Sequence, residues 1–314
     1  EILPFKTNPL MLQPFQTFPT RARFVALAVL LASLVVTAVA VTATRRAQLA
    51  EASAHFEGHA ERLGAEVQLR INRAASGLRG TRAAYVAYAR PWSRAQFRDF
   101  ITARNLGAEF PGVRGFGLIQ RVERGGLAQF VADEQRDDAP DFQVQTSGSL
   151  PDLYVIKFIE PLGVNLAAVG LDVGAEPVRR EALERAVATG EAALTAPVTL
   201  AQDQQRGTGW LLYVPMFRPG TDPQTPASRQ ALLQGILYAP IVAAEVLGDA
   251  TRMAGSAIDF RLYDGPAASG RLVFDSQERG DPLQPVADAD RYAARLFHHE
   301  QTLQMGGRTL TLQM

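Results

Sequence analysis

Three polar residues stand within the apolar stretch FIEPLGVNLAAVGLDVGAEPVRREALERA, at residues 158–186: Glu160, Asn165 and Asp172. Two neighbouring carboxylates could act as a pair in general acid–base catalysis. However, Glu160 precedes a proline at the end of an expected strand, and Asp172 stands just before an expected helix. Carboxylates at such positions usually accept hydrogen bonds from backbone N–H groups. We therefore predict that these three residues form turns and caps rather than a catalytic set.

Other residues with catalytic chemistry are sparse. The chain has no cysteine, and its histidines stand at positions 55, 59, 298 and 299, away from the central region. No nucleophile elbow, phosphate-binding loop or dinucleotide fingerprint is present in the sequence. His55 and His59 have a spacing that could hold a metal, but no third ligand accompanies them, so we expect exposed helix histidines. The sequence predicts no catalytic site, no cofactor and no metal in this chain.

The composition limits the partners. The chain has 314 residues, 47% of them hydrophobic, with a formal net charge of zero. Acidic and basic residues are interspersed, whereas a nucleic-acid-binding surface needs a strongly basic face. We therefore expect no nucleic-acid partner, and a chain long enough for two domains of ordinary size.

One apolar segment is long enough to cross a membrane. Residues 24–43 contain no charge, and about 20 such residues span a bilayer as a helix. A cleaved signal peptide is the alternative, because Ala38-Val39-Ala40 forms an A-x-A site. The apolar run is long for a signal and continues past that site. We therefore predict a membrane anchor at 24–43, preceded by a cytoplasmic tail at 1–23.

A long helix is expected directly after the anchor, at residues 44–80. This segment has no proline, and Leu49, Phe56 and Leu63 follow one another at intervals of seven. Such an apolar stripe is typical of a coiled coil or of a stalk that packs on its own domain. We predict a stalk helix, with these three residues on the seam of a homodimer.

The rest of the chain reads as two tandem α/β units, at 81–220 and 221–314. Strands are expected at 152–161 and 209–217, and between them lies a helix from Glu176 to Thr189. A proline at its first turn and a following glycine mark its ends. The prolines and small polar residues at 218–230 indicate a linker. The predicted fold class is α+β: membrane helix, stalk helix, then two small mixed units.

Four blocks of sequence resemble the CHASE domain, the extracellular sensory domain of cytokinin-receptor kinases and many bacterial receptors. The blocks are PGVRGFGLIQRV, YVIKFIEPLGVNLAAVGLDV, EPVRREALERAVATGEAALTAPVTL and GWLLYVPMF, in this order. The resemblance covers the distal unit, from about residue 112 to 217. It implies that both units are PAS-like. It also implies that a second membrane helix and a cytoplasmic output domain, a histidine kinase or a cyclic-di-GMP enzyme, follow in the receptor after residue 314.

The resemblance also implies a ligand pocket between the sheet and its covering helices. Asp152 aligns with an acidic position that can accept from ligand N–H groups; the alternative is a strand-start aspartate that faces solvent. Tyr154 and Phe158 are expected to face the pocket together, because alternate residues of a strand share a face. Lys157 is then expected to point the other way.

Further pocket residues are implied on neighbouring elements. Leu171 lies where the family has a lining residue, and Thr189 resembles a threonine that the family places beside its pocket. The alternative for Thr189 is an ordinary C-terminal helix residue before a glycine cap. Thr195 and Trp210 are expected to line the pocket from the adjoining strands.

These observations predict a ligand-sensing module of a membrane receptor, in the inner (cell) membrane with its sensor on the periplasmic or extracellular side. The expected ligand is a small molecule, with adenine-type (cytokinin-like) compounds as one candidate class. Its binding would change how the stalk helices of a homodimer pack. An exported structural or dimerisation domain without a ligand is the first alternative. An exported hydrolase is the second, against which the missing nucleophile–base set argues.

Overall fold

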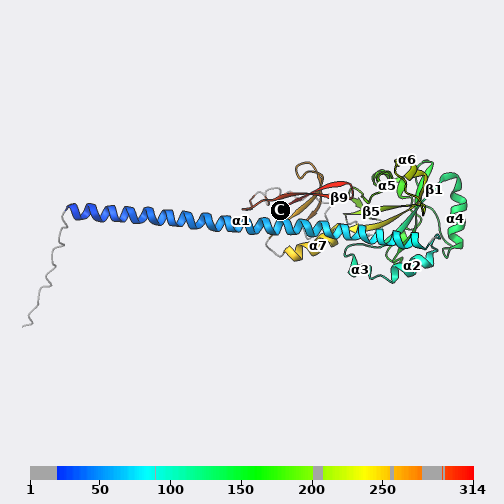
Figure 1. Ribbon diagram of the computed structural model, residues 1–314, viewed down its shortest axis with the longest axis horizontal. Helices are drawn as coiled ribbons and strands as arrows, with labels where there is room; N and C mark the ends of the chain where they lie inside the picture. The colour runs from blue at the N-terminus through cyan, green and yellow to red at the C-terminus, as the bar shows by residue number, and fades with distance from the viewer. Residues whose placement is uncertain (1–19, 89, 201–207, 255–257, 278–291, 293) are drawn as a thin grey trace, which may run out of the picture. The chain divides into compact units, whose positions relative to one another are not determined.

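The structure is a computed structural model that describes residues 20–88, 90–200, 208–254, 258–277, 292 and 294–314. The chain divides into two compact units, residues 1–55 and 56–314. The expected cytoplasmic tail, apart from its last residues, lies outside the described part. The helices and strands carry the labels of Figure 1.

The first unit contains the N-terminal part of helix α1 (Thr20–Ala87). An 18-residue window of this helix has a mean hydropathy of 2.8, so the helix is long and apolar enough to cross a membrane. The side chains of residues 21–52 are exposed in the described structure. The hydroxyls of Ser33 and Thr42 donate to helix carbonyls at Leu30 (2.8 Å) and Ala38 (2.9 Å), which satisfies them without water. These properties fit the expected anchor.

An antiparallel sheet forms the centre of the second unit. Its strands follow the order β2-β1-β6-β5-β3, and β4 pairs with β5. The strand bounds are β1 Phe116–Glu123, β2 Asp152–Glu160, β3 Ala193–Leu194, β4 Val198–Thr199, β5 Thr208–Phe217 and β6 Leu233–Val242. Strand β6 therefore lies between β1 and β5, although β1 is more than 100 residues earlier in the sequence.

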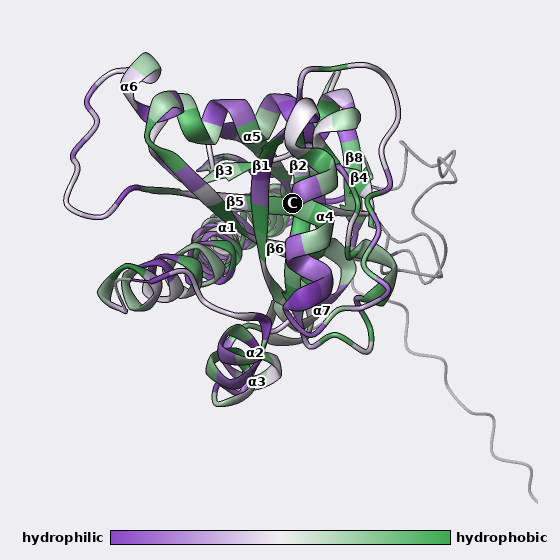
Figure 2. Ribbon diagram, turned by 90° about the vertical axis from the view of Figure 1, so that its right-hand side faces the viewer, coloured by the Kyte–Doolittle hydropathy of each residue, from purple (hydrophilic) through white to green (hydrophobic). Residues whose placement is uncertain are grey.

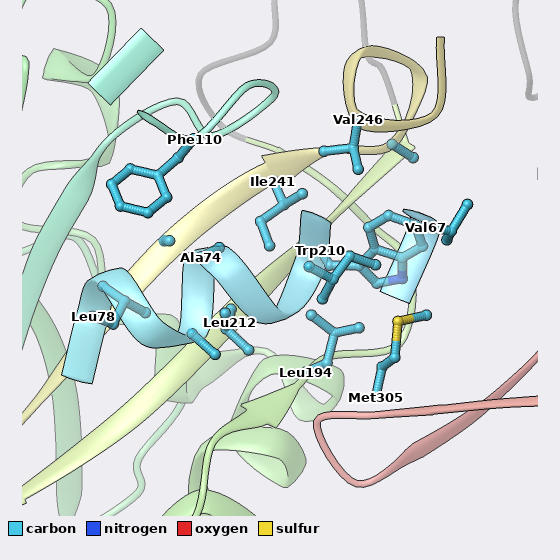
Figure 3. Packing of buried hydrophobic residues seen from close by; sticks show 14 of the residues in the cluster. Val67, Ala74, Leu78, Phe110, Leu194, Trp210, Leu212, Ile241, Val246 and Met305 are labelled. Carbon is cyan, nitrogen blue, oxygen red and sulfur yellow. The ribbon is translucent and has the colours of Figure 1, made fainter. Parts of the chain in front are cut away.

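Apolar side chains fill the space between one face of this sheet and the C-terminal part of α1. We call this set the α1-side core. Figure 3 shows part of it, with α1 residues lying over the side chains of β5 and β6. Its members include Leu63, Val67, Ile71, Ala74 and Leu78 of α1, Trp210 and Leu212 of β5, Ile241 of β6, and Met305 of β9. Helices α2 (Arg94–Thr102) and α3 (Leu106–Glu109) add Phe97, Ile101 and Leu106.

Helix α5 (Pro177–Thr189) covers the opposite face of the same sheet (Figure 2). Its bounds match the expected helix, because Pro177 occupies the first turn and Gly190 caps the end with φ of 78°. The short 3₁₀ turns η2 (Leu166–Ala168) and η3 (Val173–Ala175) cover the rest of this face. The apolar set here is called the α5-side core; it includes Tyr154, Ile156, Ala182, Leu183, Leu211, Tyr213 and Tyr238.

The outer strand β2 is covered by helix α4 (Leu127–Arg136), which follows the 3₁₀ turn η1 (Arg124–Gly126). A buried ion cluster joins α4 to α2 and β2. Glu134 accepts from Arg94 at 3.0 Å and from Lys157 at 2.6 Å. The Arg94 guanidinium also lies 5.0 Å from the centre of the Phe158 ring. Each charge in this cluster is thus paired, as buried charges must be.

A second antiparallel sheet has the order β8-β7-β10-β9. Its strands are β7 Arg261–Asp264, β8 Arg271–Asp275, β9 Glu300–Met305 and β10 Arg308–Gln313, with the expected hairpin at Gly306-Gly307. Helices α6 (Pro226–Ala231) and α7 (Ala243–Ala254) precede it. Two sheets and a long apolar helix confirm the expected α+β fold class.

The division between the sheets lies later than the boundary expected after residue 220. Strand β6 follows that point in sequence but pairs with both β1 and β5, at the centre of the first sheet. Its pattern marks it as a buried strand but contains no information about its partners. The first sheet is complete only at Val242, and the second begins at β7.

Candidate ligand-binding site

The side-chain directions along β2 decide which predicted residues can meet. Strand β1 pairs Leu118 with Phe158 but Ile119 with Ile156, so Lys157 is an extra residue that forms a bulge. A bulge reverses the alternation of side chains beyond it. Tyr154 therefore belongs to the α5-side core, whereas Phe158 belongs to the α1-side core. The expectation that Tyr154 and Phe158 share a face is wrong, and Lys157 lies on the same side as Phe158.

Trp210 also lies away from α5. Its side chain is fully buried in the α1-side core, where Figure 3 shows it close to Val67. Trp210 and Phe158 therefore contact the layer between the sheet and α1. The other predicted residues on or beside the first sheet lie on its α5 side or at its edge. The seven predicted side chains do not converge on one pocket.

A small cavity lies on the α5 side of the first sheet. Its volume is about 10 Å³, which is close to the room that one water needs. The predicted residue Leu171 forms part of its wall. The remaining described wall is apolar except for Arg179 and Tyr238, and its apolar members are Ile156, Ala168, Val173, Leu200 and Leu211. An apolar wall with a few oriented polar groups is typical of a ligand site.

Two tyrosine hydroxyls on the α5 side of the sheet have no hydrogen-bond partner in the described structure, and one of the two tyrosines, Tyr238, lines the cavity. Tyr213 of β5 and Tyr238 of β6 lie directly opposite each other in the sheet, and both side chains are fully buried. Neither hydroxyl finds a partner in the described structure. Burial raises the pKa of both hydroxyls, while the nearby charge of Arg179 lowers it. Both groups therefore stay protonated and can donate.

A glycine on β1 makes room for one of these rings. Gly117 pairs with Tyr238, and a Cβ atom there would lie 2.2 Å from the Tyr238 ring and 2.6 Å from the Phe158 carbonyl oxygen. Such distances are far below van der Waals contact, so only glycine fits at this position. The position of the Tyr238 ring thus depends on the sequence of a neighbouring strand.

Arg179 brings a positive charge to the cavity from the first turn of α5. One terminal nitrogen of its guanidinium donates to the Thr199 carbonyl oxygen at 3.0 Å. Its Nε is buried and has no hydrogen-bond partner in the described part of the chain, although it forms a long ion pair with a Glu176 carboxylate oxygen at 3.9 Å. Glu176 itself caps α5. The guanidinium is therefore held in place with donor capacity to spare.

Tyr154 and Thr195 lie on the same side of the sheet but have partners. The Tyr154 hydroxyl is 3.5 Å from the side-chain nitrogen of Gln230, and the Arg180 guanidinium lies 5.2 Å from its ring centre. The Thr195 hydroxyl is buried and accepts from the Leu211 backbone N–H at 3.0 Å. Both side chains help to form the α5 side of the unit.

Asp152 and Thr189 lie at the edges of this region. The Asp152 carboxylate accepts from Arg121 at 2.9 Å, across the β1–β2 pair. The Thr189 hydroxyl donates to the Arg185 carbonyl oxygen at 2.8 Å, within its own helix. The predicted acceptor is thus already occupied by an arginine, and the threonine is bonded as an ordinary helix-end residue.

The polar residues of the 158–186 stretch form turns and caps, as predicted. Glu160 accepts from the Leu162 N–H at 2.9 Å, and burial raises the pKa of this carboxyl. The fully buried Asn165 donates to the Arg114 and Pro161 carbonyl oxygens at 3.0 and 2.8 Å.

Asp172 holds three donors. One carboxylate oxygen accepts from the N–H groups of Tyr154 and Gly174, at 2.9 and 3.0 Å. The other accepts from the Thr146 hydroxyl at 2.7 Å. In the part of the chain that the structure describes, no group of three His, Asp or Glu side chains could hold a metal.

The sequence prediction omits Arg179, Tyr213 and Tyr238. Successive residues of a strand point to opposite faces, so in TGWLLYVPMF Leu211 and Tyr213 share one face and Trp210 and Leu212 the other. This alternation could have placed Tyr213 on the face opposite to Trp210. Nothing in the sequence indicates that its hydroxyl lacks a partner. That property depends on which side chains the fold brings to the cavity.

Comparison with known families confirms the resemblance. The family model described as "CHASE domain" matches residues 90–274, more than half of the chain. No curated protein matches the chain.

Solved structures of bacterial sensor domains show low similarity. An extracellular ligand binding receptor from Desulfohalobium retbaense has 10% identity and a TM-score of 0.47, over 82% of this chain and 38% of that one. The GABA-bound ligand-binding domain of the Pseudomonas aeruginosa amino acid chemoreceptor PctC has 12% identity and a TM-score of 0.49, over 84% and 98%. The ligand-binding domain of the Campylobacter jejuni chemoreceptor Tlp3, in complex with 4-methylisoleucine, has 10% identity and a TM-score of 0.30, over 82% and 91%. The present chain thus spans less than half of the first of these proteins.

Proposed function

Because this chain belongs to the CHASE domain family, we propose that it senses a small molecule in the cavity between its first sheet and α5. CHASE domains are extracytoplasmic sensory domains of receptors. The observation that carries the proposal is the pair of fully buried, unpartnered hydroxyls of Tyr213 and Tyr238 in the described structure. An unsatisfied buried polar group costs stability, and a functional role is one explanation for its presence.

The size of the cavity indicates how binding would act. Ligand sites usually have volumes of about 300–1,000 Å³, whereas this cavity has about 10 Å³. A ligand of more than a few atoms requires its wall to move apart. Binding would therefore select a minor, more open arrangement of α5 and the segment around Leu171, and so shift the population of states.

The α1-side core supplies a route from the first sheet to α1. Trp210 and Leu212 of β5 contribute to this core, while the neighbouring Leu211 and Tyr213 face the cavity side. A shift of β5 would change the packing on both faces of the sheet, because the strand contributes side chains to both cores. Packed cores respond to such shifts by changing between discrete arrangements. In this proposal, α1 passes the change to the membrane.

The complete receptor would carry its output in the cytoplasm. We place the anchor of α1 in the cell membrane, the inner membrane of a bacterium, with the sensor outside. A histidine kinase or a cyclic-di-GMP enzyme would follow a second membrane helix. Asp152, Tyr154, Leu171, Thr189 and Thr195 remain predicted ligand-binding residues.

A homodimer through α1 is part of the proposal, on a different face from the one expected. Leu63 is 5% exposed and lies in the α1-side core, and Phe56 stacks on Phe297 at 5.7 Å. Neither side chain is free for a seam. Leu69, which is 45% exposed, lies on the outward face of the same helix together with Ala65, Asn72, Ser76 and Ala83.

Ligand-induced stabilisation tests the proposed function. The full chain, purified in detergent micelles, would be heated with a panel of amino acids, short carboxylates and adenine-type bases. A ligand at 100 times its Kd stabilises the native state by about 2.7 kcal/mol, so Tm rises. Tyr238→Phe should reduce this shift, whereas Tyr88→Phe, at an exposed tyrosine, should not. If no compound stabilised the wild type, the ligand-free structural reading would be favoured.

A further inference from the structure

Three donors at or next to the cavity lack an acceptor among the residues that the structure describes. They are the Nε of Arg179 and the hydroxyls of Tyr213 and Tyr238, all of them buried. Tyr213 and Tyr238 are paired directly across β5 and β6, and Arg179 of α5 lines the same cavity as Tyr238. Arg179 and Tyr238 therefore reach the cavity from two sides, from the helix and from the sheet, and Tyr213 lies beside Tyr238.

Asp172, next to Leu171 in the cavity wall, uses three of its about four acceptor sites within the protein. Asp172 accepts from the N–H groups of Tyr154 and Gly174 with one oxygen and from the Thr146 hydroxyl with the other. These bonds hold the segment that contains Leu171 against β2. Asp172 therefore has about one acceptor site left, on the oxygen that accepts from Thr146.

Two other carboxylates, at the start of β2 and just before α5, also have partners within the protein. Asp152 accepts from Arg121 at 2.9 Å. Glu176 accepts from the N–H groups of Val178 and Arg179, at 3.0 and 2.9 Å, and so caps α5. The described side chains at the cavity thus offer hydrogen-bond donors in excess of acceptors.

We propose that the ligand of this cavity is a small carboxylate, bound by Arg179, Tyr213 and Tyr238. This inference rests on the proposed function and adds the chemical class. An ionised carboxylate only accepts hydrogen bonds and offers about four lone-pair sites on two oxygens, which matches a set of donors. Its charge would attract the Arg179 guanidinium, and charge-assisted hydrogen bonds are stronger than neutral ones.

Other ligand classes fit less well. The N–H edge of an adenine-type base or an ammonium group would meet Arg179 and would find only the lone pairs of the tyrosine oxygens as acceptors. A neutral amide presents one carbonyl oxygen, so it would leave one of the three donors unsatisfied and would gain no charge–charge attraction to Arg179. The hydrogen bond from Arg179 to Thr199 at 3.0 Å fixes the guanidinium for a ligand on its remaining nitrogens.

Matched acids and amides test the ligand class. The full chain in detergent micelles would be titrated calorimetrically with formate, acetate, propionate, pyruvate and lactate, and with formamide, acetamide and propionamide. Adenine and ethylammonium would be included as ligands rich in donors. We expect at least one acid to bind, with an affinity at least about tenfold above that of its amide, because a bond to a charged group is worth roughly 1.4 kcal/mol or more.

Variants locate the binding. Arg179→Gln should lower the affinity for that acid about 10- to 100-fold and remove the preference over the amide, while Arg179→Lys should retain part of it. Tyr238→Phe should weaken binding with the charge preference intact. Arg136→Gln, at an exposed arginine on α4, is the control and should change nothing. Thermal unfolding of each variant checks that it is folded.

The outcomes separate the two proposals. Binding of the acid and its amide with equal affinity, or full affinity in Arg179→Gln, would overturn the carboxylate assignment. Binding of adenine or ethylammonium alone, in a manner that Tyr238→Phe weakens, would also overturn it but would leave the proposed function standing. Binding by no compound would count against both.

Discussion

The unpartnered tyrosines predict an unusual response to mutation. Tyr213→Phe and Tyr238→Phe each remove one buried hydroxyl that has no partner in the described structure, and they keep the ring that fills the α5-side core. Most substitutions in a core lower stability. Here, the ligand-free protein should become more stable, because the lost oxygen was desolvated on folding without a compensating hydrogen bond.

The magnitude follows from the cost of an unsatisfied group. A buried polar group without a partner costs on the order of 1–3 kcal/mol. The cavity has room for about one water beside Tyr238, which would recover part of this cost. We therefore expect a gain of about 0.5–1.5 kcal/mol for Tyr238→Phe and about 1–2 kcal/mol for Tyr213→Phe. Tm should rise by about 2–4 °C per kcal/mol in a domain of this size.

Thermal unfolding of the full chain in detergent micelles, without added ligand, is the assay. Tyr292→Phe is the matched control, because the Tyr292 hydroxyl donates to Asp275 at 3.0 Å. Its removal should lower stability by about 1.5–3 kcal/mol, the range for a bond to a charged group. If Tyr213→Phe and Tyr238→Phe lowered Tm as Tyr292→Phe does, their hydroxyls would be bonded in the native state and the reasoning about the cavity would fail.

Three further predictions concern pH, helix α1 and the sheet. Burial raises the pKa of Glu160, so the folded state binds more protons than the unfolded state. The free energy of unfolding should therefore fall, relative to that of Glu160→Gln, as pH rises from about 4 to 6. If the stabilities of the two proteins changed in parallel over this pH range, the prediction would be contradicted. Leu63→Glu should unfold the protein, because Leu63 is buried, whereas Leu69→Glu should leave Tm unchanged. In analytical ultracentrifugation, Leu69→Glu should dissociate the proposed homodimer. A monomeric wild type would refute the dimer. Gly117→Ala should lower stability by about 1–3 kcal/mol and weaken ligand binding through the Tyr238 ring, and an unchanged Tm would contradict the close contact.

Local signals in the sequence predicted several elements of this fold correctly. Pro177 and Gly190 mark the ends of α5, and the glycine pair at 306–307 marks the last hairpin. The uncharged run at 24–43 is long enough for a bilayer whatever its surroundings. These features depend on a residue and its near neighbours, so they can be read without knowledge of tertiary contacts. The polar residues of the 158–186 stretch belong to the same class, since caps and turns are local.

Tertiary structure decided which side chains meet. The bulge at Lys157 arises from the pairing of β2 with β1, and it sends Phe158 away from Tyr154. Strand β6 joins the first sheet because of its partners rather than its pattern. Leu63 is buried in the core of its own domain. Its heptad spacing is equally consistent with packing against the helix of a partner chain, so the sequence did not distinguish the two.

The candidate site shows the same division. The sequence determined that Tyr213 and Tyr238 would be strand residues among apolar neighbours. Only the fold decided that their hydroxyls and the Nε of Arg179 would be buried on the same side of the sheet, with no acceptor among the described residues. A hydrogen bond depends on atoms within about 3 Å of each other. Those atoms come here from β5, β6 and α5, which become neighbours only when the chain folds.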